Sequence, residues 1–335
     1  MIFGGKMRLG FIVAFFSVVM FSFGAMSQGR NLNRSKSFVD IETRYGNKDW
    51  VNLVGDKGFT INDASFGLAK DFGDGNSALV DLAFNSSQTP AFDFSTTRSQ
   101  AYIQITRSNV VTKVGQFDTI FGVEANDSRD RLFANMGAIK AYVHPLVHAG
   151  AMVTMSRQKL VFRGLLGNPP GKGAMDNDDT PEFGVHAHYA NYDVKGGAGI
   201  LLSDSGTGNN RTNLLIDITG GMQLGSVTME ACLDYKKTSG FEKATVAAGV
   251  FGTMPMNDIM SLVGRFELLK EPVIGGAQLE SALNIGAGAS YRLATEVQVR
   301  GDLSVANIKP TSDQKKGGIN EVNPFSVGVS LVAGI

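Results

Sequence analysis

The sequence has one cysteine, Cys232, in 335 residues. A single cysteine excludes an intramolecular disulfide and argues against a cysteine-based metal cluster. Charged residues make up only 19% of the chain, the formal net charge is zero and no block of like charge occurs, so we expect no nucleic-acid partner. After residue 27, no apolar run reaches the length of roughly 20 residues that a transmembrane helix needs. These absences exclude a disulfide-stapled domain and a helical membrane bundle.

The first 27 residues form a separate segment. Lys6 and Arg8 precede the apolar run 9–26, and Ala25 and Ser27 are the small residues that a signal peptidase requires before its cut. We therefore predict a cleaved signal peptide over 1–27 and a mature chain over 28–335. The alternative is an uncleaved anchoring helix, because the run is just long enough to span a bilayer at about 1.5 Å rise per residue.

Period-two alternation of apolar and polar residues dominates the mature chain. The clearest examples are the segments 39–45, 77–85, 100–106, 227–236, 297–305 and 325–333. Each segment presents an apolar face and a polar face if it forms a strand. We count about sixteen such segments, each close to the nine to eleven residues with which a tilted strand crosses a bilayer. The 41 glycines suit the turns and crowded walls of such a fold.

The connections between these predicted strands alternate in length. The short, turn-like ones are 73–76, 107–109, 156–159, 191–193, 220–225, 254–258 and 293–295. The others are mostly longer: 46–62, 87–97, 118–138, 168–181, 204–211, 270–280 and 308–323, with 237–242 as the short exception. Short and long connections on opposite rims are typical of outer-membrane barrels.

We therefore predict an all-β fold, a transmembrane antiparallel up-and-down β-barrel of about sixteen strands. In a bilayer every backbone donor and acceptor needs an internal partner, so the sheet must close. A soluble two-sheet sandwich, the alternative, would be very large and would not explain the difference between the rims. The count falls to about fourteen or twelve if weak segments such as 139–145 or 159–166 belong to loops.

The polar faces of such a barrel line a lumen. This indicates a porin, a channel for the passive diffusion of ions and small hydrophilic solutes. The third long connection is the longest, and we expect it to fold into the lumen and narrow the pore. An external, solvated loop is the alternative, since loops usually lie on the surface. The charged residues of this connection are Asp118, Glu124, Asp127, Arg129, Asp130 and Arg131.

Alternation also assigns charged residues to the pore wall. The predicted basic residues of the wall are Arg44, Arg163, Arg265 and Arg300, with Lys113 as a further candidate. The predicted acidic residues are Asp40, Glu42, Asp81, Asp217, Glu230, Asp234, Glu267 and Asp302. Because charges that line a pore select ions, this acidic balance predicts a mild preference for cations.

The four histidines, His144, His148, His186 and His188, fall into two pairs. Imidazole is a common metal ligand, but the spacing of His186 and His188 follows equally from alternation alone. No carboxylate or cysteine is tied to the histidines by spacing. We therefore expect neither a metal site nor a cofactor.

Two other classes of barrel are alternatives to a porin. An outer-membrane phospholipase needs a serine and a histidine on its lipid-facing wall, and the outward faces here are almost wholly apolar, so we expect no enzyme. The segment 167–172 is rich in Gly and Pro, but its spacing does not fit a P-loop. A structural or adhesive barrel with a plugged lumen stays open as the second hypothesis, and it predicts a normal fold without conductance.

A short motif carries a resemblance to a known family. The run Gly115-Gln-Phe-Asp-Thr119, followed by Gly122 and Glu124, with His148-Ala-Gly150 at the next strand, resembles the β-barrel porins of the OmpL-like type from bacterial outer membranes. The resemblance implies a diffusion channel whose pore is shaped by a strand and loop that contain Gly115, Phe117, Gly122 and Glu124.

Two positions depart from that family pattern. Gln116 stands where a basic residue is expected, which bears on the charge of the pore. Ile335 stands where these barrels commonly have an aromatic residue, which bears on recognition by the outer-membrane assembly machinery. The other expected partners are the lipids of the bacterial outer membrane and small hydrophilic solutes. A homotrimer is left open, because sixteen-stranded porins are often trimers.

Overall fold

A computed structural model describes residues 35–46, 58–85, 93–94, 99–125, 131–134, 136–168, 181–204, 212–274, 277–294, 297–316, 321, 323 and 325–334. Within these ranges the side chains of 35–46, 58–64, 84–85, 93–94, 204, 212 and 332–334 are not described. The chain divides into two compact units, Met1–Ser35 and Lys36–Ile335, and the second unit contains the sheet. The predicted signal peptide, 1–27, lies outside the described residues.

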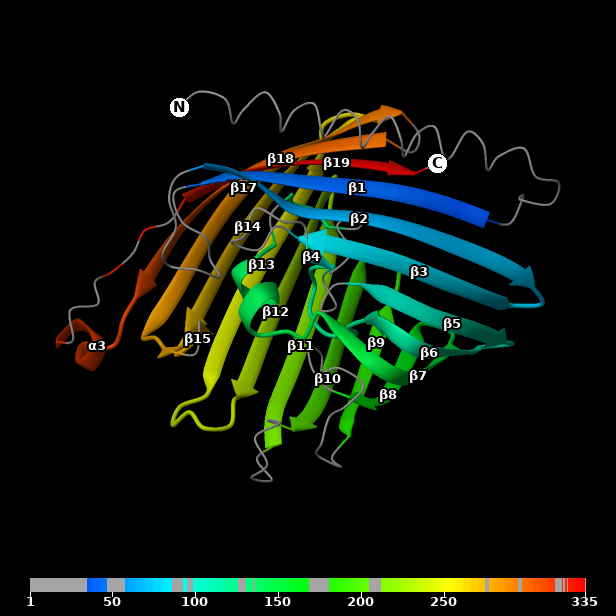
Figure 1. Cartoon of the computed structure of the whole chain (residues 1–335), viewed down its shortest axis with the longest axis horizontal. Coiled ribbons are helices and arrows are strands. Elements are labelled where there is room, and N and C mark those ends of the chain that lie inside the picture. The colour runs from blue at the N-terminus through cyan, green and yellow to red at the C-terminus, as the bar shows by residue number, and fades with distance from the viewer. Residues whose placement is uncertain are drawn as a thin grey trace. The chain divides into compact units, whose positions relative to one another are not determined.

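Long strands account for most of the described chain (Figure 1). They are β1 (Ser35–Gly46), β2 (Gly58–Gly73), β3 (Asn76–Asn85), β5 (Gln100–Arg107), β6 (Val110–Asp118), β7 (Val147–Arg157), β8 (Leu160–Asn168), β9 (Glu182–Ala190), β10 (Val194–Asp204), β11 (Thr212–Leu224), β12 (Val227–Lys237), β13 (Thr245–Pro255), β14 (Met260–Lys270), β17 (Ser281–Ala294), β18 (Val297–Lys309) and β19 (Phe325–Gly334). The short elements are β4 (Asp93–Phe94), β15 (Val273–Ile274), β16 (Ala277–Gln278), α2 (Ala138–Tyr142) and α3 (Ser312–Lys316). None of the described helices is long and apolar enough to cross a bilayer.

The long strands pair antiparallel with their neighbours in chain order, from β2 with β3 through to β18 with β19. The first strand, β1, pairs with both β2 and β19. The sheet has 17 strands if the two-residue strand β4, which pairs with β3, is included. Without β4, sixteen strands form the wall in the described part of the chain. The predicted up-and-down β-barrel of about sixteen strands is therefore confirmed.

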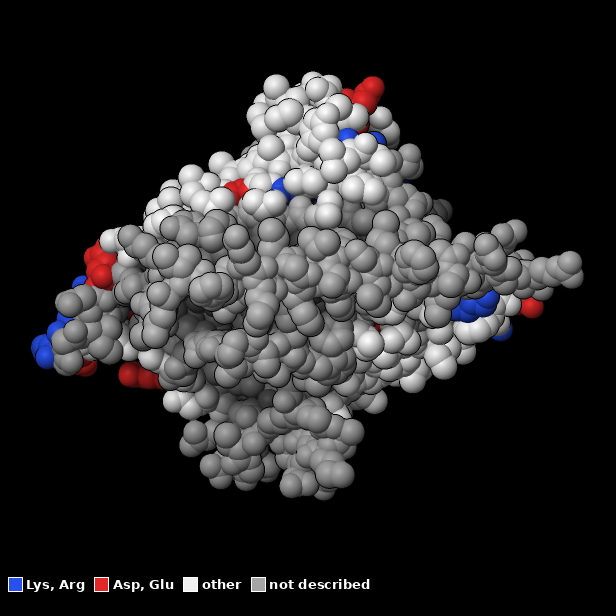
Figure 2. All heavy atoms as spheres, turned by 45° about the horizontal axis from the view of Figure 1, so that its top comes forward, with Lys and Arg blue, Asp and Glu red and all other residues white. Residues whose placement is uncertain are grey.

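Side chains alternate between two environments along the wall strands. Ile103, Leu233 and Val305 point outward and are 58%, 50% and 51% exposed. On the opposite face, Asp234 and Arg300 are only 1% and 2% exposed. A water-soluble protein does the reverse, because it buries leucine and exposes aspartate. The apolar outer face is the one expected of a barrel wall that contacts lipid, and in the view of Figure 2 the described surface carries charged side chains only in small groups.

The connections of the short rim are tight turns. Two-residue turns join β5 to β6 at Ser108-Asn109 and β7 to β8 at Gln158-Lys159. Ser108 and Gln158 have φ angles of 53° and 54°, the positive values that two-residue hairpin turns require. These turns fall where the sequence predicted short connections.

The third long connection differs in one respect from the expectation. The predicted weak strand over 139–145 is wrong, because the structure has the helix α2 there and β7 begins only at Val147. Ile139 and Val143, four residues apart, are 1% and 0% exposed, so they lie on the same buried side of a helical turn. The connection therefore extends over 119–146. The other weak segment, 159–166, forms most of β8.

Candidate functional site

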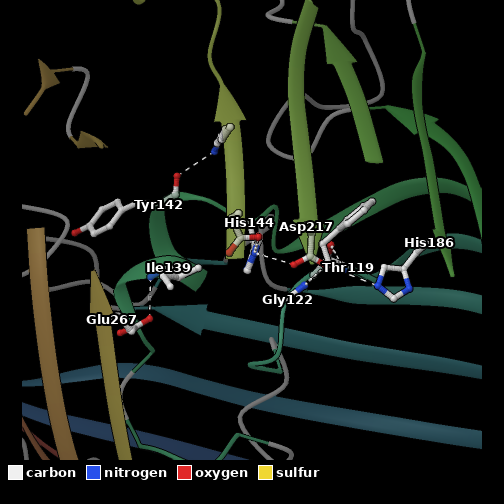
Figure 3. Close-up of polar contacts among 11 residues, drawn as sticks. Thr119, Gly122, Ile139, Tyr142, His144, His186, Asp217 and Glu267 are labelled. Atoms are coloured by element: carbon white, nitrogen blue, oxygen red, sulfur yellow. Dashed lines mark hydrogen bonds and ion pairs between the residues drawn. The ribbon is translucent and has the colours of Figure 1, made fainter. Parts of the chain in front are cut away.

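The third connection, 119–146, is bonded to the polar face of the wall at several points (Figure 3). The backbone N–H of Gly122 donates to Oδ2 of Asp217 on β11 at 3.2 Å. On β12, Nζ of Lys236 donates to the carbonyl oxygen of Tyr142 at 3.0 Å. These contacts join residues that are far apart in the sequence. The wall residues involved lie on the polar face of their strands, opposite the exposed apolar face.

The start of α2 is held by Glu267 of β14. The backbone N–H groups of Ala138 and Ile139 donate to the two oxygens of this carboxylate, each at 2.9 Å. The first turn of a helix has unpaired N–H groups, and a carboxylate satisfies them and stabilises the positive end of the helix. The side chain of Asn284 on β17 donates to the same carboxylate at 2.6 Å. Glu267 was predicted as a wall acid, and its charge here fixes the connection.

Glu124 and Arg265 form a second attachment. Oε1 of Glu124 lies 3.6 Å from Nη1 of Arg265, and Oε2 accepts the N–H of Gly137 at 2.8 Å. The Arg265 guanidinium also donates to Oγ of Ser304 at 2.8 Å and lies 4.4 Å from the ring centre of Phe133. Burial raises the pKa of Glu124 to about 6, and the nearby Arg265 opposes that rise.

The third connection also contains a buried lysine. Lys140 of α2 is 2% exposed. Burial lowers the pKa of its amine to about 8, although Asp118 and Glu124 act in the opposite direction by favouring the charged form. Asp118 is the last residue of β6, and its backbone N–H donates to the Gln100 side chain at 3.2 Å. Arg131 is also buried, at 2% exposure.

The histidines gather where the connection meets β7, β9, β11 and β12. Nε2 of His144 lies 2.8 Å from Oδ1 of Asp234. His148 contacts the carboxylate of Glu182 through Nδ1, and its Nε2 lies 2.9 Å from Oγ1 of Thr119. The sequence linked no carboxylate to any histidine, because the partners come from distant strands. Asp234 is 90 residues from His144, and spacing along the chain cannot show such a pair.

Phe121 packs between two of these histidines. Its ring centre lies 6.2 Å from that of His148 and 6.1 Å from that of His186, both in edge-to-face geometry. Phe121 is 1% exposed, as are Phe117 and Phe133. The connection is thus held by apolar packing as well as by polar bonds. The sequence did not single out Phe121, whose position after a strand gave no sign of its partners.

A cavity of about 190 Å³ lies between the connection and strands β8 to β12. Lys195 and Glu230 face each other there as an ion pair. The cavity is lined by Ile120, Gly122, Val123, Arg163, His186, His188, Lys195, Gly196, Thr219, Gly220 and Glu230. Two predicted wall residues, Arg163 and Glu230, are thereby brought to one site beside the connection.

Other predicted residues lie away from these contacts or outside the described residues. Arg300 of β18 donates to the side chain of Gln298 at 2.9 Å, and Ser304 donates to Asp302 at 3.4 Å. Asp81 of β3 is 5% exposed, and Lys113 lies over the ring of Tyr102. Asp127, Arg129 and Asp130 lie outside the described residues, as do the side chains of Asp40, Glu42 and Arg44.

The motif residues have identifiable structural roles. Gly115 has φ +130° and sits so close to the carbonyl of Ala101 that a Cβ atom would clash with it. Gly122 has φ +85°, and a Cβ atom there would overlap the imidazole of His144. Both positions therefore require glycine. Phe117 packs against His148 at 6.3 Å between ring centres. The motif thus marks the point where the wall turns into the connection.

Solved structures that share this fold include porins and channels of outer membranes. The anion-selective porin from Comamonas acidovorans is 15% identical, with a TM-score of 0.59, over 90% of this chain and 99% of its own. The outer-membrane channel DcaP of Acinetobacter baumannii is 10% identical, with a TM-score of 0.63, over 90% and 96%. Salmonella typhi OmpF in complex with daunomycin is 13% identical, with a TM-score of 0.63, over 90% and 97%. At these identities the likeness concerns the fold.

Among curated proteins, none matches this chain. The sequence model of the family described as "Putative beta-barrel porin-2, OmpL-like" matches residues 21–334. This match covers nearly the whole chain, and it agrees with the sixteen-stranded wall and with the resemblance carried by Gly115, Phe117, Gly122 and Glu124. The chain belongs to the OmpL-like beta-barrel porin-2 family.

Proposed function

We propose that the protein is an outer-membrane porin for the passive diffusion of ions and small hydrophilic solutes, with the third connection narrowing its pore. The observation that carries this proposal is the set of bonds between that connection and the polar face of β11, β12 and β14. A segment attached to the inner wall reduces the cross-section through which solutes pass. Family membership supports the porin role itself.

We further propose a mild preference for cations. Acidic side chains are frequent on the polar face beside the connection, where Asp217, Asp234 and Glu267 accompany Arg265. The preference is mild because the cavity next to the connection carries Arg163 and Lys195. Acidic residues that line a pore attract cations, and basic residues at the same depth reduce the effect. Asp127 and Asp130 of the connection would strengthen the preference for cations.

A non-conducting barrel is the second candidate, and one observation favours it. The connection places several large apolar side chains in the interior, each 1% exposed or less: Phe121, Phe133, Ile139 and Val143. These residues join inward wall residues such as Leu165 and Leu215 in one apolar cluster. A connection packed in this way could plug the lumen rather than narrow it. Such a protein would fold normally and pass no current.

The proposal includes export by a cleaved signal peptide over 1–27, insertion with the outer-membrane assembly machinery and no enzymatic activity. A homotrimer is consistent with one structural relative, OmpT of Vibrio cholerae, which is described in a trimer form. Chemical cross-linking of the protein in native outer membranes would measure its oligomeric state. A band at the monomer position alone would contradict the trimer.

Single-channel recording tests the pore. The protein, purified from outer membranes and inserted into a planar lipid bilayer, should give stable conductance steps. Glu267→Gln should increase the size or the noise of these steps, because α2 loses the carboxylate that holds its first turn. Glu280→Gln is the matched control, since Glu280 is an exposed acid of the connection after β14. Folded but silent wild-type protein would favour the plugged barrel. Equal steps in all three proteins would contradict the constriction.

A further inference from the structure

Two buried carboxylates lie directly opposite each other on neighbouring strands. Asp217 of β11 and Asp234 of β12 are paired residues in the register of these strands. They are 0% and 1% exposed. Like charges at directly opposite positions destabilise a sheet, and burial adds the cost of removing each carboxylate from water. This arrangement therefore calls for a proton or a cation between the two carboxylates.

The third connection brings an imidazole to the same point. Nε2 of His144 lies 2.8 Å from Oδ1 of Asp234 and 3.8 Å from Oδ1 of Asp217. One ligand atom from each of the three residues can be chosen so that all lie within 4.8 Å of one another. Figure 3 shows the side chains of His144 and Asp217 turned toward each other, with His186 to one side. Nε2 of His186 lies 3.7 Å from Oδ2 of Asp217.

Part of the hydrogen-bonding capacity of the two carboxylates is unused. Oδ1 of Asp217 and Oδ2 of Asp234 are buried and have no hydrogen-bond partner among the described residues. Buried polar atoms in native proteins nearly always have a partner, and exceptions point to an ion, a water molecule or a functional role. Lys236, on the same strand as Asp234, directs its amine to the carbonyl of Tyr142. An additional cation would satisfy the free oxygens of both aspartates.

We propose that His144, Asp217 and Asp234 bind a divalent transition-metal cation, with His186 as a further ligand and Zn²⁺ as the best-suited ion. Imidazole nitrogen and carboxylate oxygen together are a donor set for Zn²⁺, whereas Mg²⁺ and Ca²⁺ prefer oxygen alone. Zinc bonds to these atoms are about 2.0–2.2 Å long, so two ligand atoms lie roughly 3–3.5 Å apart. The observed separations of 2.8 and 3.8 Å from Nε2 of His144 lie on either side of this range.

The site would connect three segments of the chain. A bound ion would link β11, β12 and the end of the third connection, and so fasten that connection to the wall. The N–H of Gly122, 3.2 Å from Oδ2 of Asp217, would orient this ligand. These side chains would hold the ion whether or not the barrel conducts.

Metal binding to the full-length protein in detergent tests the site. After removal of metals with a chelator, titration calorimetry with Zn²⁺ should give one site per chain in the wild type. His144→Gln and the double variant Asp217→Asn/Asp234→Asn should bind at least tenfold more weakly. His188→Gln is the matched control, because His188 is a histidine of the same strand as His186 and is not one of the proposed ligands. Its affinity for Zn²⁺ should stay within a few-fold of wild type.

Two further measurements keep the test independent of folding defects. Co²⁺ should give a visible absorption spectrum in the wild type and in His188→Gln that His144→Gln lacks. Zn²⁺ should raise the melting temperature of the same two proteins and leave that of the folded Asp234→Asn variant unchanged. No Zn²⁺ binding by the wild type would overturn the proposal, as would equal affinity in His144→Gln. Tighter binding of Ca²⁺ or Mg²⁺ than of Zn²⁺ would overturn the assigned class of metal.

Discussion

Oε1 of Glu124 lies 3.6 Å from Nη1 of Arg265, and this contact joins the third connection to β14. Burial raises the pKa of Glu124 from 4.5 to about 6, in spite of the guanidinium. The carboxyl is therefore mainly neutral at pH 5 and mainly ionised at pH 7. Glu267 and Arg131 are the other charged groups that act on it.

This titration predicts a pH-dependent ion preference. As the pH rises through about 6, Glu124 gains a negative charge and the preference for cations should increase. Reversal potentials in a salt gradient, measured from pH 5 to 7.5, would follow the change. In Glu124→Gln, at least half of the change should disappear, while the remainder comes from other groups. An unaltered pH dependence in the variant would contradict the assignment of Glu124 to the pore.

The same pKa has a consequence for stability. Because the pKa of Glu124 in the folded protein is raised above its ordinary value, the fold favours the neutral carboxyl. The stability that this group contributes is present below about pH 4.5 and is lost as the pH rises to about 6. The difference amounts to about 2 kcal/mol. Urea unfolding at pH 4.5 and 7 should show a smaller loss of stability in Glu124→Gln than in wild type.

Removal of the guanidinium should weaken the attachment strongly. Arg265 is 3% exposed and lies near the carboxylates of Glu124 and Glu267. Arg265→Met would leave buried acids without this cation, which costs about 3–5 kcal/mol when a buried pair is broken. Urea unfolding of the protein in detergent measures this loss. Arg157→Met, at an exposed position of β7, is the control and should change stability by less than about 0.5 kcal/mol.

Gly122 of the third connection allows a test in which the side chain grows by only one methyl group. Gly122 has φ +85°, and its missing Cβ leaves room for the imidazole of His144. Gly122→Ala should cost about 1–3 kcal/mol and release the connection from the wall. Trypsin should then cleave after Lys140, which is buried in the wild type, and mass spectrometry would detect the fragments. Gly220→Ala is the control, because a Cβ atom there meets nothing within 4 Å. Equal resistance of both variants would show that Gly122 does not set the fold of the connection.

The strands could be predicted from the sequence because their pattern is local. Each wall strand has lipid on one side and a polar interior on the other, so residues two apart share an environment. The same rule failed at 139–145, where Ile139, Ala141 and Val143 also alternate with other residues. Ile139 and Val143 are buried by the inner wall and by the rest of the connection rather than by lipid. Helix and strand cannot be distinguished over so short a run.

The polar site could be predicted only in part. Alternation placed Asp234, Arg265 and Glu267 on the polar face of their strands, and these side chains are 1%, 3% and 0% exposed. Their partners could not be identified, since a barrel brings together residues that are about 90 to 130 positions apart, as for His144 with Asp234 and Ala138 with Glu267. The fold of such a loop depends on its contacts with other segments. These contacts cannot be predicted from the composition of the loop alone.

Substitution of Phe121 distinguishes a connection that narrows the pore from one that plugs it. Its ring lies between His148 and His186 and is 1% exposed. Phe121→Ala should cost about 3–5 kcal/mol, because a large buried ring leaves a cavity, and it should raise the single-channel conductance. Phe162→Ala, at a position of β8 that is 42% exposed on the outer face, removes the same ring without opening the interior. If the wild type is silent and Phe121→Ala conducts, the connection is a plug. If the wild type and Phe121→Ala both conduct and Phe121→Ala gives larger steps, the connection narrows a pore that is already open.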